Sequence, residues 1–316
     1  MSVRVGSRRS RLARVQTEQL LASLRALDPS FAWEPVLVET TGDVILDVPL
    51  REAGGKGLFV KELDEALLDG RVDCAVHSLK DIPTELPEGI RIACVPARAD
   101  PRDVLLSRDG VGLDSLLPGA VLGTTSLRRG SQLLAIEPGL RVEVLRGNVE
   151  TRLRRLVEGE FDMTLLAAAG LSRLGVDPAP ATAVPLEPFS FVPAPGQGAL
   201  AITVRSDDDV TAARFGAIDD PISRRCVETE RAAARVLGGS CHLPVAVHAV
   251  ENGGELRVVG LVASPDGSRV VRDELVALAE DAVRVGERLG RRLLEAGGGE
   301  IVAAVEAHAT GSTESG

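Results

Sequence analysis

The sequence predicts an α/β protein with two related α/β domains and a smaller C-terminal α+β domain. Short apolar runs alternate with amphipathic stretches over roughly the first two thirds of the chain, a pattern typical of strands that feed helices. The same strand-turn-helix unit recurs three times, with glycine and a capping side chain at the turn. After about residue 219 the pattern changes to one capped helix followed by strands, which indicates a separate domain.

Composition limits the class of protein. The chain has 316 residues, 44% hydrophobic and 26% charged, enough to bury the cores of two or three domains. Charged residues are spread through positions 1–30, so no apolar signal segment is expected, and no later stretch is long enough to span a membrane. We therefore expect a cytoplasmic protein without a membrane partner. A net charge of −10 argues against nucleic acid as a partner, because the long-range field repels polyanions.

The first strand-to-helix unit opens the chain. The run VRVGS at 3–7 predicts a buried strand, and Ser10 is placed to cap a helix that runs to about Leu27. AVLGTTS at 120–126 and RVEVLRGN at 141–148 predict two more strands, each followed by a helix. Such junctions present free backbone N–H groups and the positive end of the helix dipole, which suits carboxylate or phosphate; plain capping is the alternative.

Further elements fill the intervals between these units. Additional strands are expected at 74–79, 90–96 and 163–168, and helices at 60–69 and 148–158. Alternation of this kind implies largely parallel sheets. The weak similarity between GSRRSRLARVQTEQLLA and GTTSLRRGSQLLA indicates that the two domains are related and enclose a cleft. FVPAPGQGALAI at 191–202 is rich in Pro and Gly and is expected to be the hinge where the chain crosses between domains.

The C-terminal part of the chain has its own start and stop signals. Asp220 is placed as the N-cap of a helix, Pro221 at its first position and Gly238 at its end. Strands are then expected at 245–250 and 256–264, a final helix from about 279 to 295, and a disordered tail at 309–316. These signals predict an α+β domain that is separate from the two α/β domains.

Arginines are concentrated between residues 128 and 155. Seven arginines stand there against three glutamates, although the protein as a whole is acidic. We expect this basic segment to bind a local anionic ligand; a solvated helix face paired with glutamate is the alternative for any single arginine. The seven are Arg128, Arg129, Arg141, Arg146, Arg152, Arg154 and Arg155.

The four cysteines show no spacing typical of a metal site, so we expect no metal, and a disulfide framework is not expected in a reducing compartment. Cys74 and Cys94 lie in apolar strands and Cys226 on a helix, which favours burial in cores. Cys241 differs, because GGSCHLP at 238–244 presents its thiol on a loop between a helix and a strand. A reactive thiol and an incidental loop thiol both agree with that position.

Four motifs stand out: HSLKDIPT at 77–84, GTTSLRR at 123–129, LRGNVETRL at 145–153 and GGSCHLP. In order and spacing they closely resemble the porphobilinogen deaminase family, also called hydroxymethylbilane synthases, over nearly the whole chain. GGKGLFVKEL at 54–63 and PAPGQGALAI at 193–202 match as well. The chain departs from the family pattern at Leu79, where methionine is common, at Ser240 and His242 beside the cysteine, and in an extra tail. None of these departures removes a reactive group.

The resemblance implies a transferase of tetrapyrrole and haem biosynthesis. It would condense four porphobilinogen molecules head to tail, release ammonia each time and then release hydroxymethylbilane. The primer would be a dipyrromethane cofactor, made from two substrate units and joined by a thioether to Cys241. The resemblance also implies a monomer with two domains like type II periplasmic binding proteins, at 1–98 with 199–217 and at 99–198. A third domain would follow at 218–308.

Asp81 is the catalytic carboxylate that the resemblance implies, and Lys80 would hold a substrate carboxylate or orient Asp81. Each cycle passes through a cationic pyrrole species, which a fixed carboxylate stabilises while relaying protons. The end of a strand is also where α/β sites lie. Without the resemblance, an aspartate before Pro83 would be interpreted as a turn residue. His77 is expected to be a structural hydrogen-bonding residue.

The resemblance also gives the arginines a ligand. Porphobilinogen carries an acetate and a propionate, so every ring brings two carboxylates for charged and hydroxyl donors. Phe59 would stack on a pyrrole from a mobile lid; packing at a helix entry is the alternative. The implied cofactor-binding residues are Cys241, Lys80, Asp81, Thr124, Ser126, Arg128, Arg129 and Arg146. The implied substrate-binding residues are Arg8, Ser10, Phe59, Arg146, Arg152, Arg173 and Gln197.

Two other classes of protein share parts of this pattern. A non-catalytic anion-binding protein, such as a solute-binding or effector-binding domain, would account for two α/β domains and the arginines but not for the loop thiol. A cysteine-dependent acyl or phosphoryl transferase would account for the thiol but needs a histidine base. His242 is adjacent to Cys241 in sequence, where side chains tend to diverge. The deaminase function is therefore the one that we expect.

Overall fold

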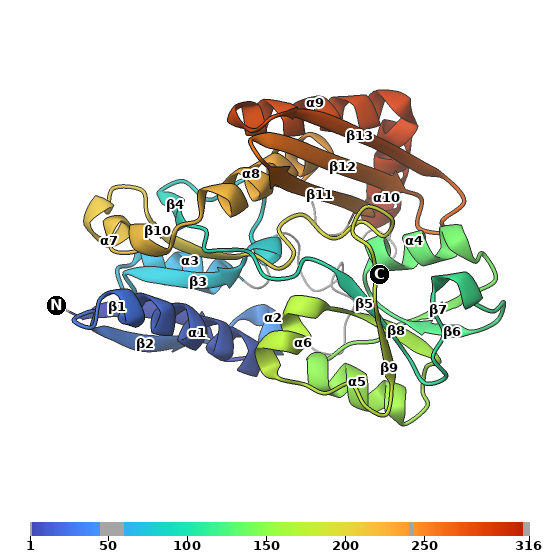
Figure 1. Ribbon diagram of the computed structural model, residues 1–316, viewed down its shortest axis with the longest axis horizontal. Coiled ribbons are helices and arrows are strands. Elements are labelled where there is room, and N and C mark those ends of the chain that lie inside the picture. The colour runs from blue at the N-terminus through green and yellow to red at the C-terminus, as the bar shows by residue number, and fades with distance from the viewer. Residues whose placement is uncertain (1, 45–59, 240–242, 312–316) are drawn as a thin grey trace.

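The computed structural model describes residues 2–44, 60–239 and 243–311. Two residues expected at the site, Phe59 and Cys241, lie outside these ranges. Within the ranges, the strands form two five-stranded sheets and one three-stranded sheet, which occupy separate parts of the molecule (Figure 1). Each sheet packs with its helices around buried apolar side chains, so the protein has several cores.

The first sheet combines the beginning of the chain with a late segment. Its strand order is β2-β1-β3-β10-β4; β1 is parallel to β2 and β3, and β10 is antiparallel to β3 and β4. Val5, Leu24 and Ile202 are buried together in its core. The elements are β1 (Val3–Arg8), α1 (Arg11–Leu27), β2 (Trp33–Val38), α2 (Thr41–Val44), α3 (Lys61–Leu68), β3 (Cys74–Ser78), β4 (Ile90–Cys94), β10 (Leu200–Arg205) and α7 (Asp209–Ala213).

The second sheet repeats this arrangement. Its order is β7-β6-β8-β5-β9; β6 is parallel to β7 and β8, and β5 is antiparallel to β8 and β9. Each strand therefore has a counterpart of the same direction in the first sheet, as expected for related domains. The elements are β5 (Asp103–Ser107), β6 (Val121–Gly123), α4 (Leu127–Ile136), β7 (Arg141–Glu143), α5 (Val149–Val157), β8 (Met163–Ala167), α6 (Ala168–Leu174) and β9 (Thr182–Pro185).

Both sheets are mixed: in each, four strands run in one direction and one strand runs against its neighbours, so the expectation of largely parallel sheets is confirmed apart from that strand. β5 follows the crossing that leaves the first sheet, and β10 follows the crossing that returns to it. In each sheet this strand enters from the other domain and runs against its neighbours. Two mixed sheets joined by a chain that crosses between them twice are the architecture of type II periplasmic binding proteins. This arrangement confirms the predicted fold class.

The two crossing segments lie against each other and leave no room for a side chain at two glycines. At Gly198, with φ of +87°, a Cβ atom would lie 2.5 Å from the carbonyl oxygen of Ala99 on the other crossing. At Gly196, with φ of +74°, a Cβ atom would lie 2.2 Å from Cδ2 of Leu79. Glycine adopts such φ values without strain. The segment predicted as a hinge is therefore packed closely against the loop after β3.

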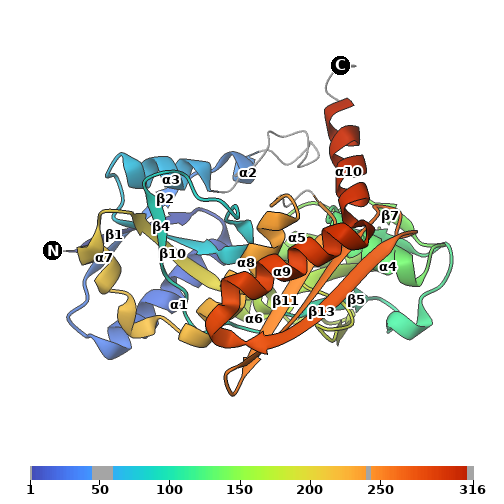
Figure 2. The same cartoon turned by 90° about the horizontal axis from the view of Figure 1, so that it is seen from above.

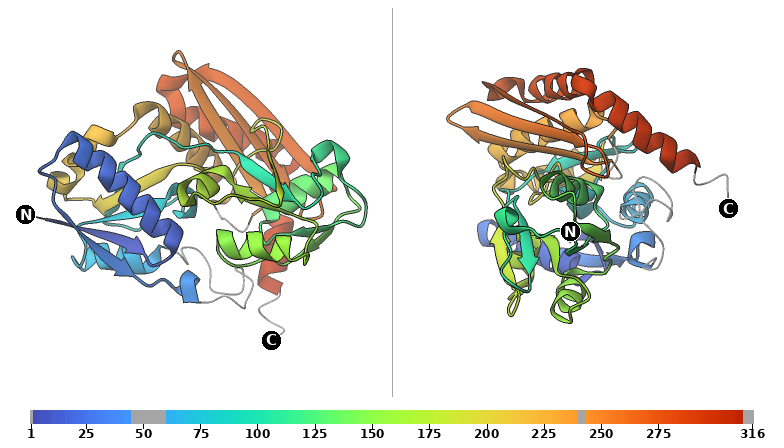
Figure 3. Two further views of the ribbon diagram at one scale, coloured as in Figure 1. Left: turned by 60° about the horizontal axis from the view of Figure 1, so that its bottom comes forward. Right: turned by 90° about the vertical axis from the view of Figure 1, so that its right-hand side faces the viewer.

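The third sheet belongs to the C-terminal part of the chain. Asp220 caps α8 by accepting a hydrogen bond from the backbone N–H of Ser223 at 2.7 Å, and Pro221 is the first helical residue, as predicted. Helices α8 and α9 contact each other and pack on the sheet, and Figure 3 shows α9 lying along it. The antiparallel order is β11-β12-β13. The elements are α8 (Pro221–Val236), β11 (Val245–Asn252), β12 (Glu255–Ala263), β13 (Val270–Leu278), α9 (Ala282–Leu293) and α10 (Gly299–Gly311).

The C-terminal end differs from the expectation. The sequence pattern did not predict β13 or α10. The final helix was expected to end near 295, and the backbone leaves the helical conformation at Gly297, with φ of +106°, before α10 begins. Helix α10 projects from the body of the protein (Figure 2) and runs to Gly311, so the first three residues of the expected tail are helical. Gly297 separates α9 from α10, and burial of Ile301 and Val302 stabilises the further helix.

The described cysteines are core residues, as expected. Cys74, Cys94 and Cys226 are buried and form no disulfide. Burial raises the pKa of Cys94 to about 12 and that of Cys226 to about 11, so neither thiol ionises at neutral pH. In the described part of the chain, no helix combines the length and the apolar character that crossing a membrane requires.

Candidate active site

Asp81 lies at the edge of the first sheet where the parallel strands β1 and β3 end. Strand β3 ends at Ser78, and residues 79–81 form one 3-10 turn that carries Lys80 and Asp81. The Oδ2 atom of Asp81 lies 3.8 Å from Nη1 of Arg8, the last residue of β1. The Asp81 side chain remains 31% exposed. A cation therefore holds the carboxylate in place while one side stays open to a ligand.

Lys80 joins this turn to the second crossing segment. Its Nζ atom donates a hydrogen bond to Oε1 of Gln197 at 3.3 Å, and Nε2 of Gln197 donates to a carbonyl oxygen of the first crossing at 2.8 Å. Burial and the guanidinium group of Arg129 lower the pKa of Lys80 to about 8, although the charge of Asp81 opposes this. The ammonium group is protonated at pH 7 and loses its proton in mildly alkaline solution.

The N-terminus of α4 is built as the sequence predicted. Ser126 is the N-cap, and its hydroxyl accepts a hydrogen bond from the backbone N–H of Arg129 at 3.4 Å. The backbone N–H of Ser126 donates in turn to Oγ1 of Thr124 at 3.1 Å. These contacts place Arg128 and Arg129 in the first helical turn, where both are buried. Their positive charge adds to that of the helix dipole.

Both arginines bind a carboxylate of the protein itself. Asp103, the first residue of β5, accepts hydrogen bonds from Nη1 of Arg128 and from Nη2 of Arg129, each at 2.7 Å. Burial raises the pKa of Asp103, but the two guanidinium groups outweigh burial and hold this pKa well below its usual range. The sequence pattern predicted no role for Asp103. The signal that could have identified it is a charged residue at the start of the apolar run DVLLS.

The N-terminus of α5 adds two arginines. Asn148 caps α5, and Nε of Arg152 donates to the carbonyl oxygen of Gly147 at 2.8 Å. Burial, together with the charges of Arg129 and Arg146, lowers the pKa of Arg152 to about 10. The positive charges of Arg129 and Arg146 therefore act on Arg152. We call the resulting group the cationic cluster; it consists of Lys80, Arg128, Arg129, Arg146 and Arg152.

The first domain approaches the cluster through the start of α1. Ser10 caps α1, as predicted, by accepting a hydrogen bond from a backbone N–H three residues later at 3.3 Å. The next residue, Arg11, forms an ion pair with Glu150 in the first turn of α5, so the starts of α1 and α5 lie across from each other. Arg173, in the last turn of α6, donates to the carbonyl oxygen of Gly198 at 2.8 Å on the second crossing.

The remaining expectations fall into two groups. His77 is a structural residue, as expected: its Nε2 lies 3.0 Å from Oγ1 of Thr203, and burial lowers its pKa to about 4. Cys241 and Phe59 lie outside the described residues, so thioether attachment and ring stacking stay predictions. In the ranges that the structure describes, no group of three or more His, Cys, Asp or Glu side chains is placed to hold a metal ion.

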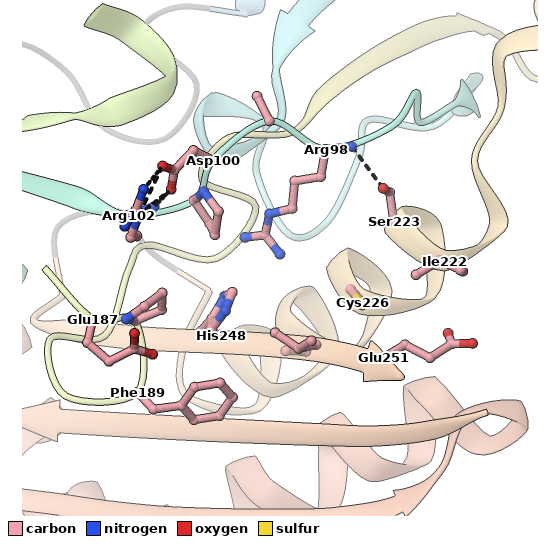
Figure 4. Close-up of a pocket in the computed structure, with 15 residues that line it drawn as sticks. Arg98, Asp100, Arg102, Glu187, Phe189, Ile222, Ser223, Cys226, His248 and Glu251 are labelled. Atoms are coloured by element: carbon pink, nitrogen blue, oxygen red, sulfur yellow. Dashed lines mark hydrogen bonds and ion pairs between the residues drawn. The ribbon is translucent and has the colours of Figure 1, made fainter. Parts of the chain in front are cut away.

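A separate cavity lies at the junction of the three domains (Figure 4). Its volume is about 450 Å³, and it is lined by both crossing segments, α8 and β11. Beside it, the fully buried Glu230 accepts hydrogen bonds from Nη1 of Arg98 at 2.6 Å, from the N–H of Gly196 at 2.7 Å and from the N–H of Ala249 at 2.8 Å. The residues that line the cavity include none of the predicted site residues that the structure describes. Arg98 and Pro101, which line the cavity, both contact Gln197, so one residue connects this junction to Lys80 of the cluster.

Two family models match this chain: the porphobilinogen deaminase dipyromethane cofactor binding domain over residues 3–213 and the porphobilinogen deaminase C-terminal domain over residues 224–295. The porphobilinogen deaminase of Chromobacterium violaceum is 47% identical over 301 residues, which cover 95% of this chain and 97% of that protein. Those of Brevibacillus brevis and Bacillus subtilis are 45% and 44% identical, covering 96% and 95% of this chain and 97% and 95% of their own lengths. The chain therefore belongs to the porphobilinogen deaminase family.

Proposed function

We propose that Asp81 is the catalytic carboxylate of this enzyme, and that the cationic cluster binds the carboxylates of its primer and substrate. As a porphobilinogen deaminase, the chain is a transferase with a dipyrromethane cofactor; it joins four porphobilinogen molecules, releases ammonia and delivers hydroxymethylbilane. The observation that carries the proposal is one half-buried carboxylate that pairs with Arg8 and is preceded in the chain by Lys80, a cation on which the charges of Arg128 and Arg129 from the second domain act.

The charge of the cluster fits a dipyrromethane. Two pyrrole rings bear four carboxylates, because each ring has an acetate and a propionate. Asp103 accepts hydrogen bonds from Arg128 and Arg129 and attracts Lys80, and Asp81 is the second negative charge that acts on Lys80. Cations in a desolvated site need anionic partners. Arg152 adds a fourth positive charge, so these cations outnumber the two carboxylates.

Guanidinium groups and helix N-termini supply the binding contacts. Arginine presents several fixed N–H donors that match a carboxylate, and the free N–H groups at the starts of α1, α4 and α5 add further donors. Because these elements come from both α/β domains, ligand carboxylates also hold the domains together. The primer contacts Thr124, Ser126, Lys80, Arg128, Arg129 and Arg146. The substrate contacts Arg8, Ser10, Phe59, Arg146, Arg152, Arg173 and Gln197.

Asp81 acts on the substrate carbon that loses ammonia. Departure of ammonia leaves a methylene cation conjugated with the pyrrole nitrogen, and a carboxylate beside that nitrogen stabilises the positive charge. Asp81 then accepts and returns the pyrrole proton within the same contact. Arg8, 3.8 Å away, orients the carboxylate. When bound, dipyrromethane supplies the free ring position to which the first substrate is joined.

Cys241 holds the primer in this proposal. In sequence it follows α8 and the Gly238–Gly239 turn, and a thioether formed there once serves all later cycles because it does not hydrolyse like an ester. The remaining proposals follow from the same arrangement. The domains comprise 1–98 with 199–217, then 99–198, then 218–308; the enzyme works as a cytoplasmic monomer without a nucleic acid partner.

Intact mass and an Ehrlich colour test on purified protein examine the proposal. The wild type should exceed its sequence mass by one dipyrromethane, give the colour and consume porphobilinogen. Cys241→Ser should fold but show neither the added mass nor the colour, whereas Cys226→Ser, a buried thiol, should match the wild type. Full cofactor on Cys241→Ser would move the attachment elsewhere. A wild type without cofactor or turnover would favour a non-catalytic anion-binding protein or a cysteine-dependent transferase.

A further inference from the structure

Arg231 binds the loop that follows Asp81. It lies on α8, only 8% of the residue is exposed, and its guanidinium group donates hydrogen bonds to three consecutive backbone carbonyls. Nη1 donates to Ile82 at 3.1 Å, and Nη2 donates to Pro83 at 2.7 Å and to Thr84 at 3.2 Å. Burial lowers the pKa of Arg231 to about 10, so the group is charged at neutral pH. The planar guanidinium group carries several N–H donors in a fixed geometry, which suits contacts with three carbonyls.

The turn at the end of α8 contacts the same loop. Oγ1 of Thr84 donates to the carbonyl oxygen of Gly239 at 3.5 Å, and a Cβ atom at Gly239 would lie 2.3 Å from that hydroxyl oxygen. The N–H of Gly239 donates to the carbonyl oxygen of Ala234 at 2.8 Å, so the turn is continuous with the helix. In sequence, Gly239 lies two residues before Cys241.

We propose that Arg231 is a positioning residue that fixes the loop carrying Asp81 against the part of the chain that leads to Cys241. This inference rests on the proposed function, because it concerns the catalytic carboxylate and the cofactor tether. Arg231 and Gly239 belong to one helix and its turn, whereas Asp81 and Thr84 follow β3 of the first sheet. The guanidinium group therefore joins the two halves of the site. A displacement of about 1 Å between reacting groups costs about a hundredfold in rate.

A residue that only stabilises the domain interface has a different signature. Its loss lowers folding stability and the fraction of protein that carries the dipyrromethane cofactor. We call such protein loaded; its kcat per molecule stays unchanged. Loss of a positioning residue lowers kcat in fully loaded protein with little change in KM, because the cations that bind the substrate lie elsewhere. Turnover per cofactor, with KM measured separately, therefore distinguishes the two roles.

The experiment compares Arg231→Ala and Arg231→Lys with the control Arg225→Ala. Arg225 lies on the same helix, but it pairs with Glu251 at 2.7 Å and not with the loop that follows Asp81. We expect kcat per loaded molecule to fall between about tenfold and about a hundredfold in Arg231→Ala, with KM changed by less than about threefold. In Arg231→Lys, kcat per loaded molecule should fall less. Added methylguanidinium should restore part of the activity of Arg231→Ala, and Arg225→Ala should have the kcat of the wild type.

Hydrogen exchange at the backbone amides of residues 84–86 is a second readout that does not depend on activity. Exchange should be faster in Arg231→Ala and unchanged in Arg225→Ala. Unchanged exchange, or wild-type kcat in loaded Arg231→Ala, would overturn the inference; if that variant does not fold, Arg231→Lys decides by the same two readouts. Failure of the proposed function would appear instead in the wild type, as absence of dipyrromethane and of porphobilinogen consumption.

Discussion

Replacing Asp103 by asparagine removes the negative charge that holds Arg128 and Arg129 together. Asp103 accepts four hydrogen bonds, at 2.7 and 3.3 Å from Arg128 and at 3.0 and 2.7 Å from Arg129. Its side chain is fully buried, and the arginine side chains are 6% and 8% exposed. Removing one member of a buried ion pair leaves uncompensated charge, so Asp103→Asn should lower the free energy of unfolding by about 3–5 kcal/mol.

The pH dependence of this loss identifies the charge as its cause. The ordinary pKa of this carboxyl is 3.8, and the two guanidinium groups lower it further in the folded protein. A group whose pKa is lowered by folding stabilises the protein above its unfolded pKa, and this contribution is lost as the pH falls through the folded pKa. The difference in the free energy of unfolding between wild type and Asp103→Asn should be constant from about pH 5 to pH 8 and should shrink below about pH 4.

Urea unfolding followed by circular dichroism measures this difference. Both proteins carry Cys241→Ser, so that ligand carboxylates do not replace the lost charge. Asp100→Asn is the matched control: Asp100 also binds an arginine, Arg102, but 34% and 43% of these two side chains are exposed. Asp100→Asn should lower the free energy of unfolding by less than about 1 kcal/mol. Equal losses in the two variants, or a loss below about 1 kcal/mol for Asp103→Asn, would refute the reasoning.

Three other outcomes are expected. Asp81→Asn should keep its primer yet lose at least about a hundredfold in porphobilinogen consumption, with Asp81→Glu between; activity of loaded Asp81→Asn within a few-fold of wild type would make Asp81 a turn residue. Because the pKa of Lys80 is lowered to about 8, kcat/KM should fall above that pH as the ammonium group deprotonates, and Lys80→Arg should extend the plateau; the same decline in both proteins would exclude Lys80 as its cause. Arg129→Leu should prevent primer assembly, whereas Arg152→Leu should accumulate enzyme with added rings; wild-type mass spectra for both would contradict carboxylate binding by the cluster.

The helix starts were predictable because their signals are local. Ser10, Ser126 and Asp220 each accept a hydrogen bond from a backbone N–H three residues later, as the sequence suggested. A cap and an apolar stripe involve residues within one or two helical turns. A short window of sequence therefore contains the information that decides where these helices begin.

The strands were less predictable because their signals are not local. The sequence pattern did not identify β2, β5, β9, β10 or β13, and it did not give the mixed direction of either α/β sheet. In β13 several large apolar residues are exposed, including Val270, Val276 and Leu278. Strand direction depends on the end from which the chain enters the sheet, and β5 and β10 enter by crossings. The preference of a residue for strands depends on its neighbours across the sheet.

The sequence by itself determined the family motifs, the capped helices and the identity of the cations near Asp81. Only the tertiary structure decided that Arg128 and Arg129 bind Asp103, which is 25 and 26 residues away in the chain, and that Arg231 holds the loop after Asp81. The physical reason is that a buried charge takes its partner from whichever elements meet in space. The motif that contains Arg128 and Arg129 is equally compatible with a carboxylate of the ligand and with one of the protein. The first crossing brings β5 and its carboxylate to the start of α4, and that position is a property of the folded chain.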